Sequence, residues 1–232
     1  MSFIHRKNIN SLTNQTEHSK IVNMNSQINN KNIILEAIRS HVPSWHYDYT
    51  PITDTSNYFI QPKEPLTEWF KKTLEALSGT CIISENIEET ISYIKQKTAS
   101  ETIYCTDNEI QTLLTQYEIQ FSDSDESSRF SKFSVTHCEA LVARTGSVIV
   151  SSNQITGRRP IASSEVHIVI AYAKQLYADF PQAFSIIESK YQNAFPSQIT
   201  SITGPSRTAD IEKTLVLGAH GPKELIVLLI EK

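Results

Sequence analysis

The chain lacks clustered cysteines, long apolar runs and an N-terminal secretory signal. Its three cysteines, Cys81, Cys105 and Cys138, lie far apart, with no C-x-x-C pair and no Cys/His cluster at metal-ligand spacing. An odd number of isolated cysteines indicates buried free thiols in a reducing compartment. No stretch approaches the roughly eighteen apolar residues of a membrane span. We therefore expect a cytoplasmic protein that has no membrane span and binds no metal or iron–sulfur cluster itself.

The chain also lacks an excess of basic residues and the common nucleotide and hydrolase motifs. Lysine and arginine number 21 against 25 aspartates and glutamates, which leaves a formal net charge of -4. This balance argues against nucleic acid or an anionic membrane as a partner. No G-x-G-x-x-G, Walker A, G-x-S-x-G or H-E-x-x-H motif occurs. Nucleotide-binding, serine-hydrolase and zinc-protease functions therefore have no support.

The composition predicts an unstructured tail followed by one domain. Residues 1–26 are rich in Asn, Ser and Lys, with too few apolar side chains to offset the entropy lost on ordering. The remaining residues, 27–232, are enough for a single α/β domain without disulfides. We expect its N-terminal part, to about residue 78, to be helical.

Apolar spacing predicts alternating helices and strands. Expected helices cover residues 27–42, 66–79, 87–98 and 108–117, and expected strands cover residues 80–84 and 101–106. Thr67 is the expected N-cap of the second helix. In the second half, two apolar strands meet at Thr145–Gly146, and residues 165–180 read as a strand that runs into a helix. The pattern predicts an α/β fold with a mostly parallel sheet flanked by helices, carrying a hairpin or an antiparallel edge.

Four polar loops at strand ends are the expected functional region, because ligands of open α/β sheets bind outside the carboxyl ends of the strands. They are ARTGS (143–147), TGRRP (156–160), TGPSRTAD (203–210) and GAHGP (218–222). In the third loop, Ser206, Arg207 and Thr208 offer backbone N–H groups, two hydroxyls and a guanidinium that suit a small carboxylate. The alternative is that the hydroxyls cap a turn and that Arg207 pairs with Asp210.

The other three loops supply a histidine and further polar groups. His220 lies in a tight turn, where it can exchange a proton near neutral pH or simply join two loops. Arg158 could add anion affinity, or form a solvated pair with its neighbour Arg159. Thr145 and Ser147 border the hairpin turn, where they could contact the same ligand or serve the turn alone. We expect Arg207, His220 and Thr145 to converge on one cleft, whereas His167, inside a strand, fits a core position better.

The order of these loops, ARTGS, TGRRP…EVHIVI, TGPSRTADIE and VLGAHGPKEL, after the helix NIILEAIR, resembles the LUD-domain family and specifically its lactate utilization protein C (LutC/YkgG) group. The resemblance covers about residues 30–232. It implies a NagB/RpiA/CoA-transferase-like α/β fold and a role in oxidising lactate to pyruvate. It also implies two partner proteins that carry cysteine-rich and iron–sulfur modules.

The resemblance implies that the small carboxylate expected at Arg207 is lactate or pyruvate. His220 would then lie near the hydroxyl of lactate. Arg144 departs from the family, which has an acidic residue at this position, so Arg144 could strengthen anion binding or point to solvent. We expect a component of a complex. The alternatives are a non-catalytic assembly subunit that docks partners through the same loops and, by fold analogy only, a CoA transferase or sugar-phosphate isomerase.

Overall fold

The computed structural model describes residues 30–40, 62, 64–124, 126–154, 160–192, 194–208, 216–218 and 220–231. The chain divides into two units, Met1–Thr53 and Asp54–Lys232, which we describe separately. In the first unit, residues 30–40 form the helix that the apolar spacing predicts. Its side chains Ile33, Ile34 and Ile38 are exposed. The predicted tail, residues 1–26, lies outside the described residues.

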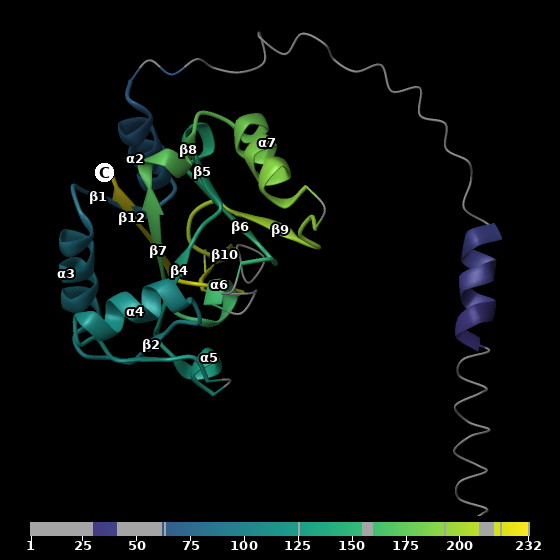
Figure 1. Ribbon diagram of the computed structural model, residues 1–232, viewed down its shortest axis with the longest axis horizontal. Helices are drawn as coiled ribbons and strands as arrows, with labels where there is room; N and C mark the ends of the chain where they lie inside the picture. Colours follow the sequence, from purple (N-terminus) through teal and green to yellow (C-terminus); the bar gives the residue numbers. More distant parts are fainter. Residues whose placement is uncertain are drawn as a thin grey trace, which may run out of the picture. The chain divides into compact units, whose positions relative to one another are not determined.

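The second unit is built on a six-stranded, fully parallel sheet in the order β1-β12-β7-β4-β2-β3 (Figure 1). The strands are β1 (Thr80–Ser84), β2 (Ile103–Tyr104), β3 (Phe121–Ser122), β4 (Phe133–His137), β7 (Val166–Tyr172) and β12 (Glu224–Ile230). Parallel sheets are buried on both faces, which is why β12 is a nearly continuous apolar run. The predicted α/β fold with a mostly parallel sheet flanked by helices is confirmed.

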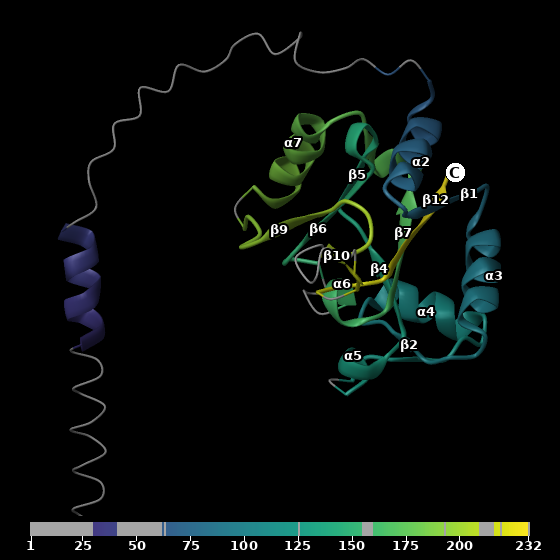
Figure 2. The ribbon, with the colours of Figure 1, turned by 180° about the vertical axis from the view of Figure 1, so that it is seen from behind.

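Alternate residues of β12 enter two different cores, as the two-residue period of a strand requires. Ile226 and Leu228 face the core beneath α3 (Ile87–Thr98) and α4 (Asn108–Gln116). Leu225 and Val227 face the core that contains α2 (Leu66–Ala76). Figure 2 shows α3 and α2 as separate layers beside this sheet.

A second sheet packs on the α2 side in the order β8-β5-β6-β9. Its strands are β5 (Ala140–Val142), β6 (Ser147–Ser151), β8 (Leu176–Tyr177) and β9 (Ile199–Ile202). Strands β5 and β6 are antiparallel and joined by a 3-10 turn at Ala143–Thr145, so the predicted hairpin is confirmed. The hairpin belongs to this separate sheet, however, and not to an edge of the parallel one. The outer face of the second sheet is covered by α7 (Phe180–Tyr191).

Several predicted element boundaries are wrong. The N-cap of α2 is Pro65 and not Thr67. Residues 165–180 do not run from a strand directly into a helix, because a 3-10 turn (Ala173–Gln175) and β8 intervene before α7 begins. The short pairing of β8 with β5 overrides the local helical pattern. The remaining short elements are α5 (Ser127–Phe130), α6 (Pro160–Ser163), β10 (Arg207–Thr208) and β11 (Val216–Leu217).

Gly146 fixes the contact between the hairpin turn and α2. Its φ is +60°, and a Cβ atom added there would lie 2.7 Å from the backbone nitrogen of Leu74. We expect Gly146→Ala to lower the free energy of unfolding by roughly 2–5 kcal/mol, since left-handed strain adds to a backbone clash. Denaturant unfolding would measure the loss. Gly221→Ala is the control: its Cβ would make only an ordinary 3.4 Å contact with Ser206, so a similar loss in both variants would contradict the explanation.

Candidate functional site

A cavity of about 410 Å³ lies at the carboxyl ends of β2, β4 and β7, the edge of a parallel sheet where ligands bind. The volume is within the usual range for small-molecule sites, roughly 300–1,000 Å³. Most of the residues that line it are polar or charged, although they also contribute apolar surface. The described lining residues are Asp107, Glu109, His137, Cys138, Asn153, Gln154, Tyr172, Lys174, Gln175, Lys190 and Tyr191.

Asp107 and His137 form a hydrogen-bonded pair on this wall. Asp107 follows β2 and is the N-cap of α4, where one of its oxygens accepts bonds from the N–H groups of Glu109 and Ile110. Its other oxygen, Oδ2, lies 3.2 Å from Nδ1 of His137, the last residue of β4. Strands β2 and β4 are neighbours in the sheet, and this pairing brings the two residues together.

The Asp107 carboxylate orients the imidazole ring of His137. The hydrogen bond from His137, helped by the backbone N–H groups, outweighs burial and lowers the pKa of Asp107. The carboxylate therefore stays ionised and accepts, so Nδ1 of His137 donates to it. In the neutral imidazole, Nε2 is then the acceptor nitrogen, and it has no hydrogen-bond partner within the described part of the chain. This tautomer is the one required of a histidine acting as a general base.

A second polar cluster centres on Glu139, whose side chain is only 1% exposed. Its carboxylate accepts hydrogen bonds from Lys190 Nζ (2.7 Å), Tyr191 Oη (2.6 Å) and Ser151 Oγ (2.6 Å). Burial alone would raise the pKa of Glu139, but these three donors outweigh it and lower the pKa. The cluster ties the end of α7 to β6 and to the segment between β4 and β5.

Lys174 is the cation on the wall that is available to a ligand anion. Its Nζ lies 5.3 Å from the centre of the Tyr172 ring, a cation–π contact that positions the ammonium. Lys190 is held by Glu139, whereas no carboxylate pairs with Lys174 among the described residues. Gln175 connects two other residues that line the cavity. Its Nε2 donates to the Cys138 carbonyl, and its Oε1 accepts from the Tyr172 N–H. Among the described lining residues, Lys174 is therefore the lysine that can pair with a monocarboxylate.

The three cysteines are buried free thiols, as predicted. Burial raises the pKa of both Cys81 and Cys105 to about 12, and it also raises the pKa of Cys138. All three therefore remain protonated at neutral pH. Among the residues that the structure describes, no three His, Cys, Asp or Glu side chains are grouped so that they could hold a metal ion. The helices in this part of the chain are too short or too polar to cross a bilayer.

The predicted site residues near the hairpin lie at the C-terminal end of α2 and not in this cavity. Ser147 Oγ lies 2.7 Å from Thr145 Oγ1 and 2.8 Å from Thr203 Oγ1. The guanidinium of Arg207 donates to the carbonyl of Leu77, the C-cap residue of α2. A cation at this position satisfies a helix-end carbonyl and complements the helix dipole. Arg207 thus has a fold-supporting contact, and its predicted alternative partner Asp210 lies outside the described residues.

The two C-terminal loops are joined through their backbones. The N–H of Ser206 donates to the Pro222 carbonyl (2.8 Å), and the Gly218 N–H donates to the Ser206 carbonyl (3.0 Å). Thr208 pairs with Val216 in the β10–β11 ribbon. Strand β11 belongs to this ribbon and not to the parallel sheet. The loop after β11, which carries His220, therefore joins the parallel sheet at the start of β12.

His220 consequently lies at the amino edge of the parallel sheet, so placing its loop at the carboxyl edge was wrong. It is exposed and lines a pocket of about 290 Å³ with Ser164, Glu165 and Lys223. Neither Arg207 nor Thr145 is among the described residues that line this pocket. Arg158, with Arg159, lies outside the described residues, so the predicted roles of this loop set stay predictions.

The structure also shows the surroundings of Arg144 and His167, the two other polar residues considered in the sequence. Arg144 forms an ion pair within the fold: its Nε and Nη2 donate to both carboxylate oxygens of Asp179, the N-cap of α7, while its side chain stays 36% exposed. His167 is fully buried, as its strand position suggested, and burial lowers its pKa to about 4. Its Nε2 lies 2.9 Å from Thr136 Oγ1, while Nδ1 has no partner in the described part.

Sequence reasoning missed the cavity residues because it missed two elements. Strand β4 was not expected, although Phe133–His137 alternates apolar and polar side chains. Helix α7 was not expected either, although Asp179, Pro181 and Gln182 carry the signature of a capping box with proline in the first turn. These two signals would have placed His137 at a strand end and Lys190 and Tyr191 at a helix end.

Comparison with known proteins places these features in a family context. A family model described as the LUD domain matches residues 17–230. The chain is 36% identical over 89 residues to an uncharacterized protein of Neisseria meningitidis serogroup B and 34% identical over 99 residues to Lactate utilization protein C of Bacillus licheniformis. These matches cover 38% and 42% of this chain, and only 38% and 41% of the relatives' lengths.

Two further similarities extend over more of the chain. Lactate utilization protein C of Macrococcus caseolyticus is 24% identical over 231 residues, which cover 93% of this chain and 99% of the relative. The crystal structure of a DUF162 family protein from Deinococcus radiodurans superposes with a TM-score of 0.53 at 14% identity, covering 71% of this chain and 96% of that one. The latter likeness concerns the fold alone.

Proposed function

Because this chain belongs to the LUD domain family, we propose that it is a component of a lactate utilization system and binds a small 2-hydroxy carboxylate in the carboxyl-edge cavity. Relatives named Lactate utilization protein C support the substrate class. The observation that carries the location is the Asp107–His137 pair on the wall of a ligand-sized cavity.

In this proposal the chain binds lactate and accepts its hydroxyl proton. Lys174 pairs with the carboxylate, and Nε2 of His137 accepts the proton of the C2 hydroxyl. Asp107 stabilises the imidazolium that forms, because the carboxylate already accepts the Nδ1–H bond. Protonated Cys138 beside the site adds no competing nucleophile, since burial raises the pKa of its thiol.

Oxidation of lactate to pyruvate releases two electrons and two protons, one of which is the hydroxyl proton taken by His137. The former O–H electron pair, left on oxygen, forms the new C=O bond; the C2–H bond breaks, its electron pair supplies the two electrons that are passed on, and its hydrogen leaves as the second proton. Iron–sulfur clusters on two partner proteins, expected from the family resemblance, would accept these electrons one at a time. Reconstitution tests this role: lactate-dependent dye reduction by the two partners should require this chain.

A second function class uses the loops at the opposite edge. The Ser206 and Arg207 loop and the His220 loop are connected to each other and to α2, which favours a role in fold support or partner docking. If dye reduction requires the chain but tolerates every change to the cavity, the chain is an assembly component. Loss of copurification on mutating His220 or Arg207 would support that function.

Lys174→Met should weaken lactate binding by about tenfold or more, because a hydrogen bond to a charged group contributes roughly 1.5–3 kcal/mol. Calorimetric titration of the full chain with lactate measures the change. Lys132→Met is the matched control: Lys132 also lies over an aromatic ring, at 5.4 Å from the Phe133 centre, but it does not line the cavity. Unchanged binding in Lys174→Met together with lost binding in Arg207→Ala would move the carboxylate to the loops.

A further inference from the structure

The cavity is larger than lactate requires. Its volume is about 410 Å³, whereas lactate fills roughly 180 Å³ even if each non-hydrogen atom takes the space of a liquid water molecule. More than half of the volume is left when lactate occupies the His137 end. Water or a further part of a ligand must fill the remainder.

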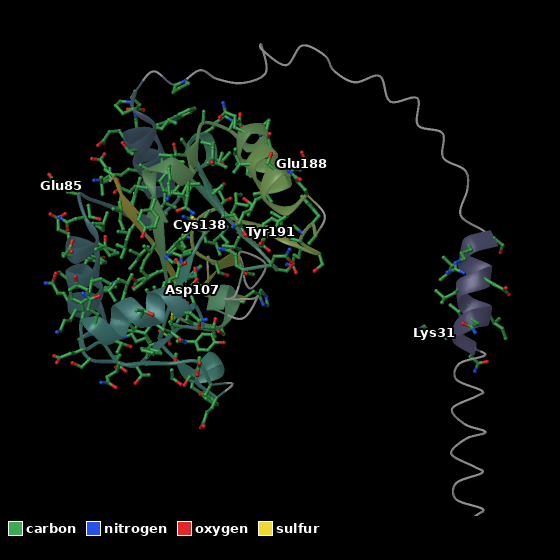
Figure 3. All side chains as sticks on the ribbon, in the orientation of Figure 1. Lys31, Glu85, Asp107, Cys138, Glu188 and Tyr191 are labelled. Atoms are coloured by element: carbon green, nitrogen blue, oxygen red, sulfur yellow. The ribbon has the colours of Figure 1, made fainter. Side chains whose placement is uncertain are left out.

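The unused volume extends toward a different part of the unit. Asp107 and Glu109 stand at the start of α4, whereas Tyr191 ends α7. Figures 1 and 2 show α4 and α7 on opposite sides of the strands, and in Figure 3 Asp107 and Tyr191 project from these separate elements. The cavity therefore reaches from the Asp107–His137 pair to a far end formed around β6 and α7.

The far end presents an amide donor and an amide acceptor that no described residue uses. Gln154 accepts the Ser151 N–H through Oε1, which leaves its Nε2 amide hydrogens without a partner in the described part. Asn153 donates through Nδ2 to the Ala194 carbonyl, which leaves Oδ1 as a free acceptor by the same criterion. Lys190 and Tyr191 are occupied by Glu139, so the lysine charge is already offset.

We propose that the cavity takes 2-hydroxy carboxylates with a neutral hydrogen-bonding tail, and that Asn153 and Gln154 form the subsite for that tail. A primary carboxamide matches the pair, because it accepts from Gln154 Nε2 and donates to Asn153 Oδ1. An anionic tail is disfavoured, since Glu139 already neutralises Lys190, the described cation at this end of the cavity. This inference rests on the proposed function, which places the hydroxy acid head at His137.

Calorimetric titration of the full chain with three probes tests it: lactate, 2-hydroxyglutaramate, and 2-hydroxy-5-methylhexanoate as the apolar isostere of the amide. We expect 2-hydroxyglutaramate to bind about tenfold tighter than lactate and about fivefold or more tighter than the isostere, because two neutral hydrogen bonds are added. Gln154→Glu keeps the oxygen that accepts from Ser151 but loses the donor. It should reduce the amide preference to about twofold, because only the Asn153 hydrogen bond remains, and leave the lactate Kd within about threefold.

Gln96→Glu is the control, since Gln96 is exposed on α3 and does not line the cavity. It should keep the amide preference. Lactate binding without any preference for the amide would overturn the tail subsite and leave the proposed function standing. An amide preference that is undiminished in both Gln154→Glu and Gln154→Met would also overturn it. Binding of none of the three probes would overturn the proposed function and this inference with it.

Discussion

His137→Asn should lower the rate of lactate-dependent dye reduction by the reconstituted system by about 10²–10⁴-fold, the usual contribution of a positioned general base. The asparagine amide can still donate to Asp107, but the side chain has no basic nitrogen to take the hydroxyl proton. We expect the lactate Kd and the copurification of the partners to be nearly unchanged. The loss would then lie in turnover and not in assembly.

His220→Asn is the matched comparison, because it makes the same chemical change at the opposite edge of the parallel sheet. It should leave turnover within about twofold if the cavity is the site. The reverse result, a large loss at His220 and none at His137, would place proton transfer in the loop and reject the cavity. Asp107→Asn should follow His137→Asn with a smaller loss, since asparagine caps α4 as well as aspartate does but removes the charge beside the imidazole.

Glu139→Gln should lower the free energy of unfolding by about 2–3 kcal/mol at pH 7. Removing one partner of a buried ion pair costs roughly 3–5 kcal/mol, and the value here is smaller because Lys190 is 55% exposed. A glutamine has one acceptor oxygen and cannot satisfy Ser151, Lys190 and Tyr191 together. Denaturant unfolding with parallel thermal scans measures the loss.

The pH dependence of the free energy of unfolding distinguishes the contribution of the Glu139 charge from that of its packing. The pKa of Glu139 is lower in the folded chain than its ordinary value of 4.5, so the ionised form is favoured by folding. Its contribution is complete above pH 4.5 and is lost as the pH falls through the folded pKa. The difference in the free energy of unfolding between wild type and Glu139→Gln should therefore become smaller in acid. Glu188→Gln, at an exposed position of α7 (Figure 3), should change neither the stability nor its pH profile.

Local apolar spacing was sufficient to predict strands β1 and β2 and the helices that follow them. The amphipathic stripe that buries Ile91 and Ile94 in α3, and the short apolar run of β1 before it, are properties of neighbouring residues. The turn at Gly146 is likewise local, because few residues adopt its positive φ. Boundaries failed where tertiary pairing decided them, as when residues 176–177, expected to be helical, paired with β5 as strand β8.

The sequence by itself determined the fold class, the buried thiols and the family, because each depends on composition or on motifs contiguous in the chain. Only the tertiary structure decided which polar residues meet. His137 reaches Asp107 across 30 positions because β2 and β4 are neighbours, and Glu139 reaches Lys190 across 51 because α7 folds back over the second sheet. The loops richest in turn residues instead lie at α2 and at the amino edge of the parallel sheet. The order of the strands, and not the polarity of the loops, determines which loops become neighbours.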